Sequence, residues 1–164
     1  MARRVFYSFH YAPDCQRAAL VRNMGMIEGD PPVSDNDWES VKRGGDAAIQ
    51  RWIAGQIAGK SCAVVLIGSQ TASRKWVRYE IIEAWKARKG VVGIYIHKLK
   101  NLAGEQATKG PNPFDAIDFG PPRKLSSVVK AYDPGGLSSQ EAYAWINQHL
   151  ANAVEEAIQI RERF

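Results

Sequence analysis

Residues 61–90 read SCAVVLIGSQTASRKWVRYEIIEAWKARKG, which predicts a strand, a polar loop and a helix in that order. The segment at 61–68 is a short apolar run rich in Val, and such runs are typical of strands buried on both faces of a parallel sheet. Residues 73–88 carry apolar side chains at helical spacing, with Ser73 as the expected N-cap and Gly90 after the end of the helix. A buried strand followed at once by a helix is the unit from which parallel α/β sheets are built.

The rest of the chain continues this alternation. Strands are expected at 3–9, near Val33, at 91–97 and at 126–133, and helices at 13–27, at 45–58 and from about Ser138 to near the end. Residues 98–124 are too rich in Pro and Gly for a regular element. The order predicts an α/β fold in which about five parallel strands carry helices on both faces, and the length of 164 residues suits one domain, 1–164.

The composition argues against several classes of function. The formal net charge is +5, but the basic residues are scattered, which favours solubility over nucleic-acid binding. No apolar run approaches the roughly 20 residues of a membrane span, and the N-terminus has no signal-peptide pattern. Cys15 and Cys62 lie in apolar patterns and are expected to be reduced core thiols, so we expect a cytoplasmic protein.

The familiar enzyme motifs are absent from the sequence. It contains neither the GxGxxG fingerprint of dinucleotide-binding folds nor the P-loop, and it has no GxSxG nucleophile elbow. The three histidines, His10, His97 and His149, are far apart, and no Cys, His or Asp spacing suggests a zinc site. These absences exclude most standard catalytic signatures.

One acidic residue has a notable position in the helix predicted at 73–88. At roughly 100° per residue, Val77 and Ile81 belong to the buried stripe, and Glu80 lies roughly 60° to one side of Val77. Trp76 lies roughly 40° further round, so Glu80 and Trp76 share one flank at the rim of the buried face. From spacing alone, a solvated helix glutamate beside a half-buried tryptophan is the simpler interpretation.

Four segments resemble a known family. The loop and helix start in VLIGSQT (65–71) and WVRYEI (76–81) are similar to the TIR-domain box in which a Ser-rich loop leads into Trp-x-x-x-Glu, and RVFYSFHY (4–11) is similar to the first TIR box. Together with KGPNPFD (109–115), they resemble the ThsB group of TIR-like proteins from bacterial Thoeris anti-phage defence. The resemblance covers about residues 3–118 and implies a flavodoxin-like TIR fold.

The resemblance also implies an activity. TIR enzymes cleave the bond between nicotinamide and ribose in NAD, which makes Glu80 the expected catalytic residue and Trp76 an expected wall of the substrate site. A carboxylate there can stabilise the oxocarbenium-like ribosyl cation that forms when nicotinamide leaves. NAD is the implied substrate, with no metal and no further cofactor. The implied product is a cyclic ADP-ribose isomer, an anti-phage signal that activates a separate effector protein.

Further substrate contacts are expected at the edge of the sheet. Ligands of such sheets bind outside the carboxyl ends of the strands, where the strand order reverses. The segments expected there are those after the first and third strands and the loop at 29–44, and the candidates within them are Ser8, His10, Tyr11, Asp35, Trp38, Ser69 and Ser73. For each of these residues, turn capping or partial burial explains the position equally well.

Other functions stay open at the level of sequence. A plain NAD hydrolase would have the same motifs, and a non-catalytic TIR adaptor would act by self-association as a homo-oligomer. A flavodoxin-like receiver domain would require an acidic cluster or a phosphate loop near the first strand, and SFHYAPDC (8–15) supplies neither. The trigger, which in this family would come from phage infection, leaves no mark that the sequence reveals.

Overall fold

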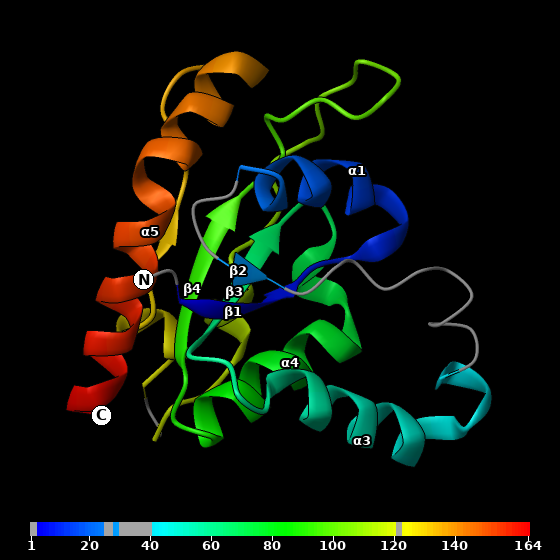
Figure 1. The fold of residues 1–164 in the computed structure, drawn as a ribbon, viewed down its shortest axis with the longest axis vertical. Helices are drawn as coiled ribbons and strands as arrows, with labels where there is room; N and C mark the ends of the chain where they lie inside the picture. The colour runs from blue at the N-terminus through cyan, green and yellow to red at the C-terminus, as the bar shows by residue number, and fades with distance from the viewer. Residues whose placement is uncertain (1–2, 25–27, 30–40, 121–122) are drawn as a thin grey trace.

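The computed structural model describes residues 3–24, 28–29, 41–120 and 123–164, and its elements alternate along the chain (Figure 1). The strands are β1 (Arg4–Ser8), β2 (Glu28–Gly29), β3 (Cys62–Ile67), β4 (Gly90–Tyr95) and β5 (Ala131–Tyr132). The α-helices described between and after them are α1 (Tyr11–Arg22), α3 (Gly45–Ile57), α4 (Lys75–Lys86) and α5 (Ser139–Arg163). Short 3-10 turns are η1 (Thr71–Ser73), η2 (Pro113–Ala116) and η3 (Leu125–Ser127).

The five strands form one parallel sheet in the order β2-β1-β3-β4-β5. The predicted α/β fold, with about five parallel strands, is therefore confirmed. The strand order reverses between β1 and β3, and there the last residue of β1, Ser8, lies opposite Val65. In sheets of this kind the crevice for a ligand lies beyond the carboxyl ends of the two strands at the reversal.

Two apolar clusters cover the two faces of the sheet, because successive side chains of a strand point to opposite sides. Val5 and Val64 pack in the cluster that includes α1 and α5, whereas Phe6 and Val65 pack in the cluster that includes α3 and α4. Figure 1 shows α3 and α4 together along one side of the sheet, with α1 and α5 away from them. Ser8 follows Phe6 by two residues, so its side chain points toward the α3–α4 layer.

The first helix begins and ends earlier than the predicted range of 13–27. The Asp14 amide donates to the His10 carbonyl (3.2 Å), so the helix already turns before Pro13, which is tolerated in the first helical turn. At the other end, the Met24 amide donates to the Val21 carbonyl (3.2 Å), which tightens the last turn and ends α1.

Of the two predicted strands near Val33 and at 126–133, the structure tests only the second. Val33 lies outside the described residues, and the second strand that the structure describes is the short β2. The strand predicted at 126–133 is wrong in extent, because within this range only β5 (Ala131–Tyr132) pairs with β4, and a 3-10 turn precedes it. Leu125 and Val129 are both buried and are four residues apart, which is the spacing of a helical turn and not the alternation of a strand.

The loop between β3 and α4 contains a 3-10 turn that the sequence interpretation missed. Ser73 is not the N-cap of the following helix: its hydroxyl donates to the Gln70 carbonyl (2.8 Å), and α4 begins at Lys75 after Arg74. The Gly68 amide donates to the Thr71 hydroxyl (2.8 Å), which closes the same turn from the β3 side. The loop is thus folded on itself where it leaves the sheet.

The long C-terminal helix begins where the sequence predicts, after Ser138, and its first turn is capped. The Ser138 hydroxyl accepts from the Glu141 amide (3.0 Å), and the Glu141 carboxylate accepts from the Ser138 amide (3.3 Å), which is a capping box. Near the other end, the Arg161 guanidinium donates to the Trp85 carbonyl (3.0 Å) and lies over the Trp85 ring. The helix therefore packs against the end of α4 as well as against the sheet.

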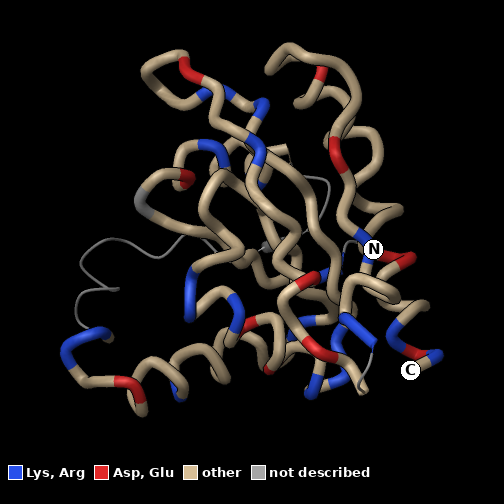
Figure 2. Tube along the Cα trace, turned by 180° about the vertical axis from the view of Figure 1, so that it is seen from behind, with Lys and Arg blue, Asp and Glu red and all other residues tan. Residues whose placement is uncertain are grey.

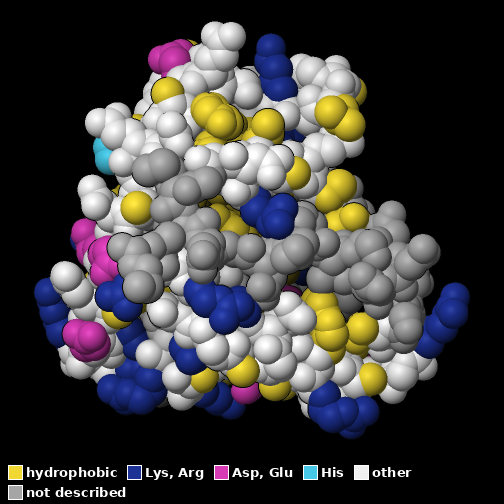
Figure 3. All heavy atoms as spheres, viewed as in Figure 1, with side chains coloured by type: hydrophobic (Ala, Val, Ile, Leu, Met, Phe, Trp, Pro, Cys, Tyr) yellow, Lys and Arg dark blue, Asp and Glu magenta, His cyan; other side chains and the backbone are white. Residues whose placement is uncertain are grey.

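Charged side chains of both signs occur across the molecule. Figure 2 shows Lys and Arg interleaved with Asp and Glu along the trace, and Figure 3 shows basic side chains along the lower edge, where Figure 1 places α3 and α4. Among the described residues, no helix combines the length and the apolar character needed to cross a membrane. Both cysteines are free, but only Cys62 is a core thiol, because Cys15 is partly exposed.

Candidate active site

The site begins at the carboxyl end of β1, where a polar side chain replaces the apolar pattern of the strand. Ser8 is 1% exposed, so water hardly reaches its hydroxyl. The hydroxyl donates a hydrogen bond to Oε2 of Glu80, which is 72 residues further along the chain. Because Ser8 points toward the α3–α4 layer, this bond joins the sheet to α4 at the reversal of the strand order.

Glu80 lies at the rim of the buried face of α4, as the helical spacing predicts. Val77, Ile81 and Ala84 are buried beneath the helix, and Glu80 beside them is partly buried. Burial raises the pKa of Glu80 to about 8, and the hydrogen bond from Ser8 acts in the opposite direction. The carboxyl is thus poised near neutral pH, which is common for functional carboxyl groups in clefts.

Trp76 lies one helical turn before Glu80 and is partly buried. Its ring packs edge-to-face on Tyr79, with 5.5 Å between the ring centroids, and Lys75 Nζ lies 4.7 Å from the Trp76 ring centroid. Trp76 also contacts the apolar cluster under α4. These contacts hold the indole in one place on the flank that it shares with Glu80.

His10 and Tyr11 mark the turn from β1 into α1. His10 is at the N-cap position of α1 but makes no side-chain cap, and its buried Nδ1 has no hydrogen-bond partner among the described residues. Burial lowers the pKa of His10, and the positive charge of Arg74 lowers it further. His10 therefore lies near the start of α4, on the same edge of the sheet as Ser8, while the Tyr11 ring is 6.1 Å from that of Phe9.

The other predicted contact residues are less closely associated with Glu80. Ser69 follows β3 and is partly buried, and Ser73 is exposed and serves the turn described above. Asp35 and Trp38 lie outside the described residues. Hydrogen bonding in the described part of the chain therefore joins only Ser8, of the predicted contacts, directly to Glu80.

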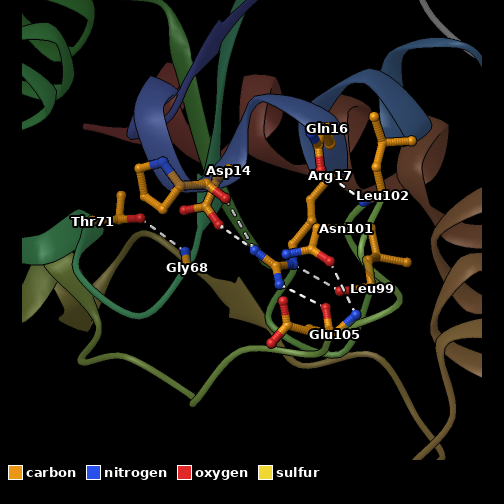
Figure 4. Close-up of polar contacts among 10 residues, drawn as sticks. Asp14, Gln16, Arg17, Gly68, Thr71, Leu99, Asn101, Leu102 and Glu105 are labelled. Carbon is orange, nitrogen blue, oxygen red and sulfur yellow. Dashed lines mark hydrogen bonds and ion pairs between the residues drawn. The ribbon is translucent and has the colours of Figure 1, made fainter.

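A buried ion pair that the sequence interpretation missed supports the neighbouring loop (Figure 4). Arg17 Nη1 donates to Asp14 Oδ1 (3.1 Å), and the same guanidinium donates to the carbonyls of Leu99 (2.7 Å) and Glu105 (2.8 Å). Oδ2 of Asp14 has no hydrogen-bond partner among the described residues and lies against Gly68, where an added Cβ would be 2.1 Å from it. The network fixes the start of α1 to the loops that follow β3 and β4.

The geometry defines what the site can do chemically. A carboxyl at the reversal of the strand order, partly removed from water, can accept hydrogen bonds from sugar hydroxyls and can stabilise a developing positive charge. The described residues contain no cluster of three His, Cys, Asp or Glu side chains that could hold a metal ion. The partly buried carboxyl of Glu80 is the candidate for this charge stabilisation.

Comparison with known proteins identifies the family of the chain. Residues 6–101 match the family described as Thoeris protein ThsB, TIR-like domain, and the matched region includes Ser8, Trp76 and Glu80. A protein of Bacillus cereus (strain MSX-D12), named "Putative cyclic ADP-D-ribose synthase ThsB1", is 39% identical over 124 residues. That alignment covers 73% of this chain and 65% of the relative, so the chain spans a little less than two thirds of the relative's length. The chain belongs to the ThsB family of Thoeris TIR-like proteins.

Proposed function

We propose that this chain is an enzyme that cleaves the nicotinamide–ribose bond of NAD and forms a cyclic ADP-ribose isomer, with Glu80 as its catalytic residue. The observation that carries the proposal is the partly buried Glu80 carboxyl, held by Ser8 at the reversal of the strand order. The name of the Bacillus cereus relative supports the choice of product.

The proposed reaction needs little beyond this carboxyl. When the C–N bond breaks, the bonding electrons leave with nicotinamide, which is cationic in NAD and becomes neutral, so the leaving group needs no general acid. The ribose retains an oxocarbenium-like positive charge, which the ionised Glu80 stabilises. A nucleophilic atom of the adenosine half of the same molecule then captures the cation, with loss of a proton where that atom is a hydroxyl oxygen, and gives the cyclic isomer. Capture by water with loss of a proton gives linear ADP-ribose.

Two residues near Glu80 can contribute to the proposed reaction. Trp76 is large, apolar and fixed by Tyr79, so it can form a wall that limits the access of water to the cation. His10 lies on the same edge of the sheet as Ser8, and its imidazole is a candidate to form a hydrogen bond to a hydroxyl or phosphate oxygen of the substrate. NAD enters as a substrate, and the reaction uses no resident cofactor. The cyclic product would then activate a separate effector protein.

The test is incubation of the purified chain with NAD, with and without extract of phage-infected cells, and analysis of the products by mass spectrometry. Free nicotinamide and a product of cyclic ADP-ribose mass are expected. Glu80→Gln should lower turnover on the order of 100-fold or more. Glu83→Gln, on the same helix and ion-paired with Lys86 (3.7 Å), is the matched control and should keep turnover.

Two outcomes would overturn the proposal. One is near-normal turnover by a folded Glu80→Gln protein. The other is the absence of nicotinamide release by the folded wild-type chain in extract of infected cells, which would favour a non-catalytic adaptor that acts by self-association.

A further inference from the structure

Ser8 is a buried hydroxyl among apolar neighbours. On the side of the sheet that faces α4, the described side chains next to it include Phe6 on β1 and Val65 on β3, and both are buried. A buried hydroxyl without a partner is destabilising, and here its partner is Glu80. An alanine would fit the packing of this strand end, so packing alone does not explain the serine.

We infer that Ser8 is a positioning residue for the proposed reaction: its hydroxyl fixes the direction of the Glu80 carboxyl and favours the ionised form of that carboxyl. The inference rests on the proposed function of Glu80. The ionised carboxylate only accepts hydrogen bonds, and the Ser8 hydroxyl, which has a proton to donate, is suited to it. Because β1 is hydrogen-bonded to β2 on one side and to β3 on the other, the hydroxyl has a fixed place from which to orient a helix side chain.

The electrostatics of the site agree with this role. Burial raises the pKa of Glu80, and the Ser8 hydrogen bond is the influence that lowers it. Other titratable groups occur on α4 and on the elements around it or next to their ends, among them His10, Asp46, Arg51, Arg74, Lys75, Arg78, Tyr79, Glu83, Lys86 and Tyr95. The shift in the pKa of Glu80 arises from burial and from Ser8, and from none of these groups. Asp46 and Lys75 are paired with each other (3.0 Å) and are largely exposed.

The first test measures the Glu80 carboxyl directly, without NAD. The carboxyl carbons of the full chain are labelled with 13C, Glu80 is assigned by comparison with Glu80→Gln, and its NMR shift is followed against pH. Ser8→Ala should move the titration midpoint of Glu80 upward by about one pH unit. Ser8→Thr keeps a hydroxyl and should restore the wild-type midpoint. Ser127→Ala removes an exposed hydroxyl that bonds to the Lys124 carbonyl, and should change nothing.

The second test measures the reaction. In Ser8→Ala the pH dependence of NAD turnover should move upward with the NMR midpoint, and kcat should fall more than KM rises. A merely structural serine would lower the melting temperature without moving either the midpoint or the pH profile. If Ser8→Ala does not fold, Ser8→Cys takes its place, because a thiol is a weak donor of similar size and should also raise the midpoint.

The outcomes separate this inference from the proposed function. A folded Ser8→Ala or Ser8→Cys protein with the wild-type midpoint overturns the inference, whether or not the wild-type protein turns over NAD. A raised midpoint together with a displaced pH profile supports it. If the midpoint rises but the wild-type chain never releases nicotinamide, the proposed function fails, and with it the catalytic role of the contact.

Discussion

Arg17 and Asp14 form an ion pair, 3.1 Å between Nη1 and Oδ1, in which the two side chains are 5% and 1% exposed. The guanidinium also donates to two backbone carbonyls of the loop after β4, so one side chain holds a helix and a distant loop together. Breaking a buried pair by removing one partner leaves an uncompensated charge, which is far more costly than losing a pair on the surface.

Arg17→Met should therefore lower the free energy of unfolding by about 3–5 kcal/mol, as measured by urea denaturation. The double variant Arg17→Met/Asp14→Asn should lose less stability than the two single variants lose together, because it leaves no unpaired buried charge. Arg3→Met breaks the exposed Arg3–Glu155 pair and serves as the control with a much smaller effect. Equal effects of the two arginine changes would contradict the argument.

The pKa of Glu80 predicts how the reaction depends on pH. Burial raises this pKa to about 8, and the proposed reaction uses the ionised carboxylate. The value of kcat/KM should therefore rise with pH and level off above about pH 8, with a fall of about tenfold for each pH unit below. A profile that is flat from about pH 6 to about pH 9 would show that ionisation of Glu80 does not limit the reaction.

The same shift predicts an effect on stability. The pKa of Glu80 rises from the ordinary glutamate value of 4.5 to about 8 in the folded chain, so between these values the unfolded chain is ionised while the folded chain keeps its proton. This group therefore costs stability progressively as pH rises from about 4.5 to about 8, and the cost is constant above that range. Below about pH 4.5 both states are protonated and the cost disappears.

The glutamine side chain in Glu80→Gln cannot ionise, so this variant should not lose stability as the pH rises. Its free energy of unfolding should equal that of the wild type near pH 4.5 and exceed it by about 2 kcal/mol near pH 8, which is less than the full conversion of the shift because the carboxyl is only partly buried. Denaturation by urea at both pH values provides the measurement, with Glu83→Gln as the control that stays parallel to the wild type. A Glu80→Gln chain less stable than the wild type near pH 8 would refute the sign of the effect.

Trp76 should contribute to both stability and turnover. It packs edge-to-face on Tyr79 and contacts the cluster under α4, so Trp76→Ala should lower the free energy of unfolding by about 2–3 kcal/mol and reduce NAD turnover. Trp76→Phe keeps an aromatic wall and should retain most of both. Unchanged melting and unchanged turnover in Trp76→Ala would mean that the indole neither packs nor borders the substrate.

The local parts of this structure could be predicted from the sequence because they depend on periodicity. A continuous apolar run predicted β3, which is buried along its whole length, and helical spacing predicted the buried stripe of Val77, Ile81 and Ala84. The same spacing placed Glu80 at the rim of that stripe. The alternation of side chains along β1 also places Ser8 on the side of α4. Sequence spacing does not tell, however, how far the Ser8 hydroxyl lies from the Glu80 carboxyl.

Other contacts left no signal that sequence reasoning could use. Asp14 and Arg17 are three residues apart, which suggests an ordinary helix pair and nothing more. The acceptors that give Arg17 its role are backbone carbonyls 82 and 88 residues away, and any residue type supplies a carbonyl. The prediction that Ser73 is the N-cap was wrong because a serine before a helix can have either of two roles. It can cap the helix, or it can close the preceding turn, as the hydrogen bond from Ser73 to Gln70 does.

The last prediction concerns the product of the proposed reaction. A cyclic ADP-ribose isomer should exceed linear ADP-ribose, because capture by the adenosine half requires that water be kept from the ribosyl cation, and the partly buried Trp76 places an apolar ring on the flank of α4 that it shares with Glu80. Chromatography of the reaction mixture against linear ADP-ribose, with mass detection, distinguishes the two, since hydrolysis adds one water to the mass. Trp76→Ala provides an internal comparison, because opening the wall should shift the ratio toward the linear product even where total turnover falls. If linear ADP-ribose dominates in the wild type under activating conditions, with no isomer of cyclic mass, the chain is a plain NAD hydrolase and the effector must respond to something other than a cyclic product.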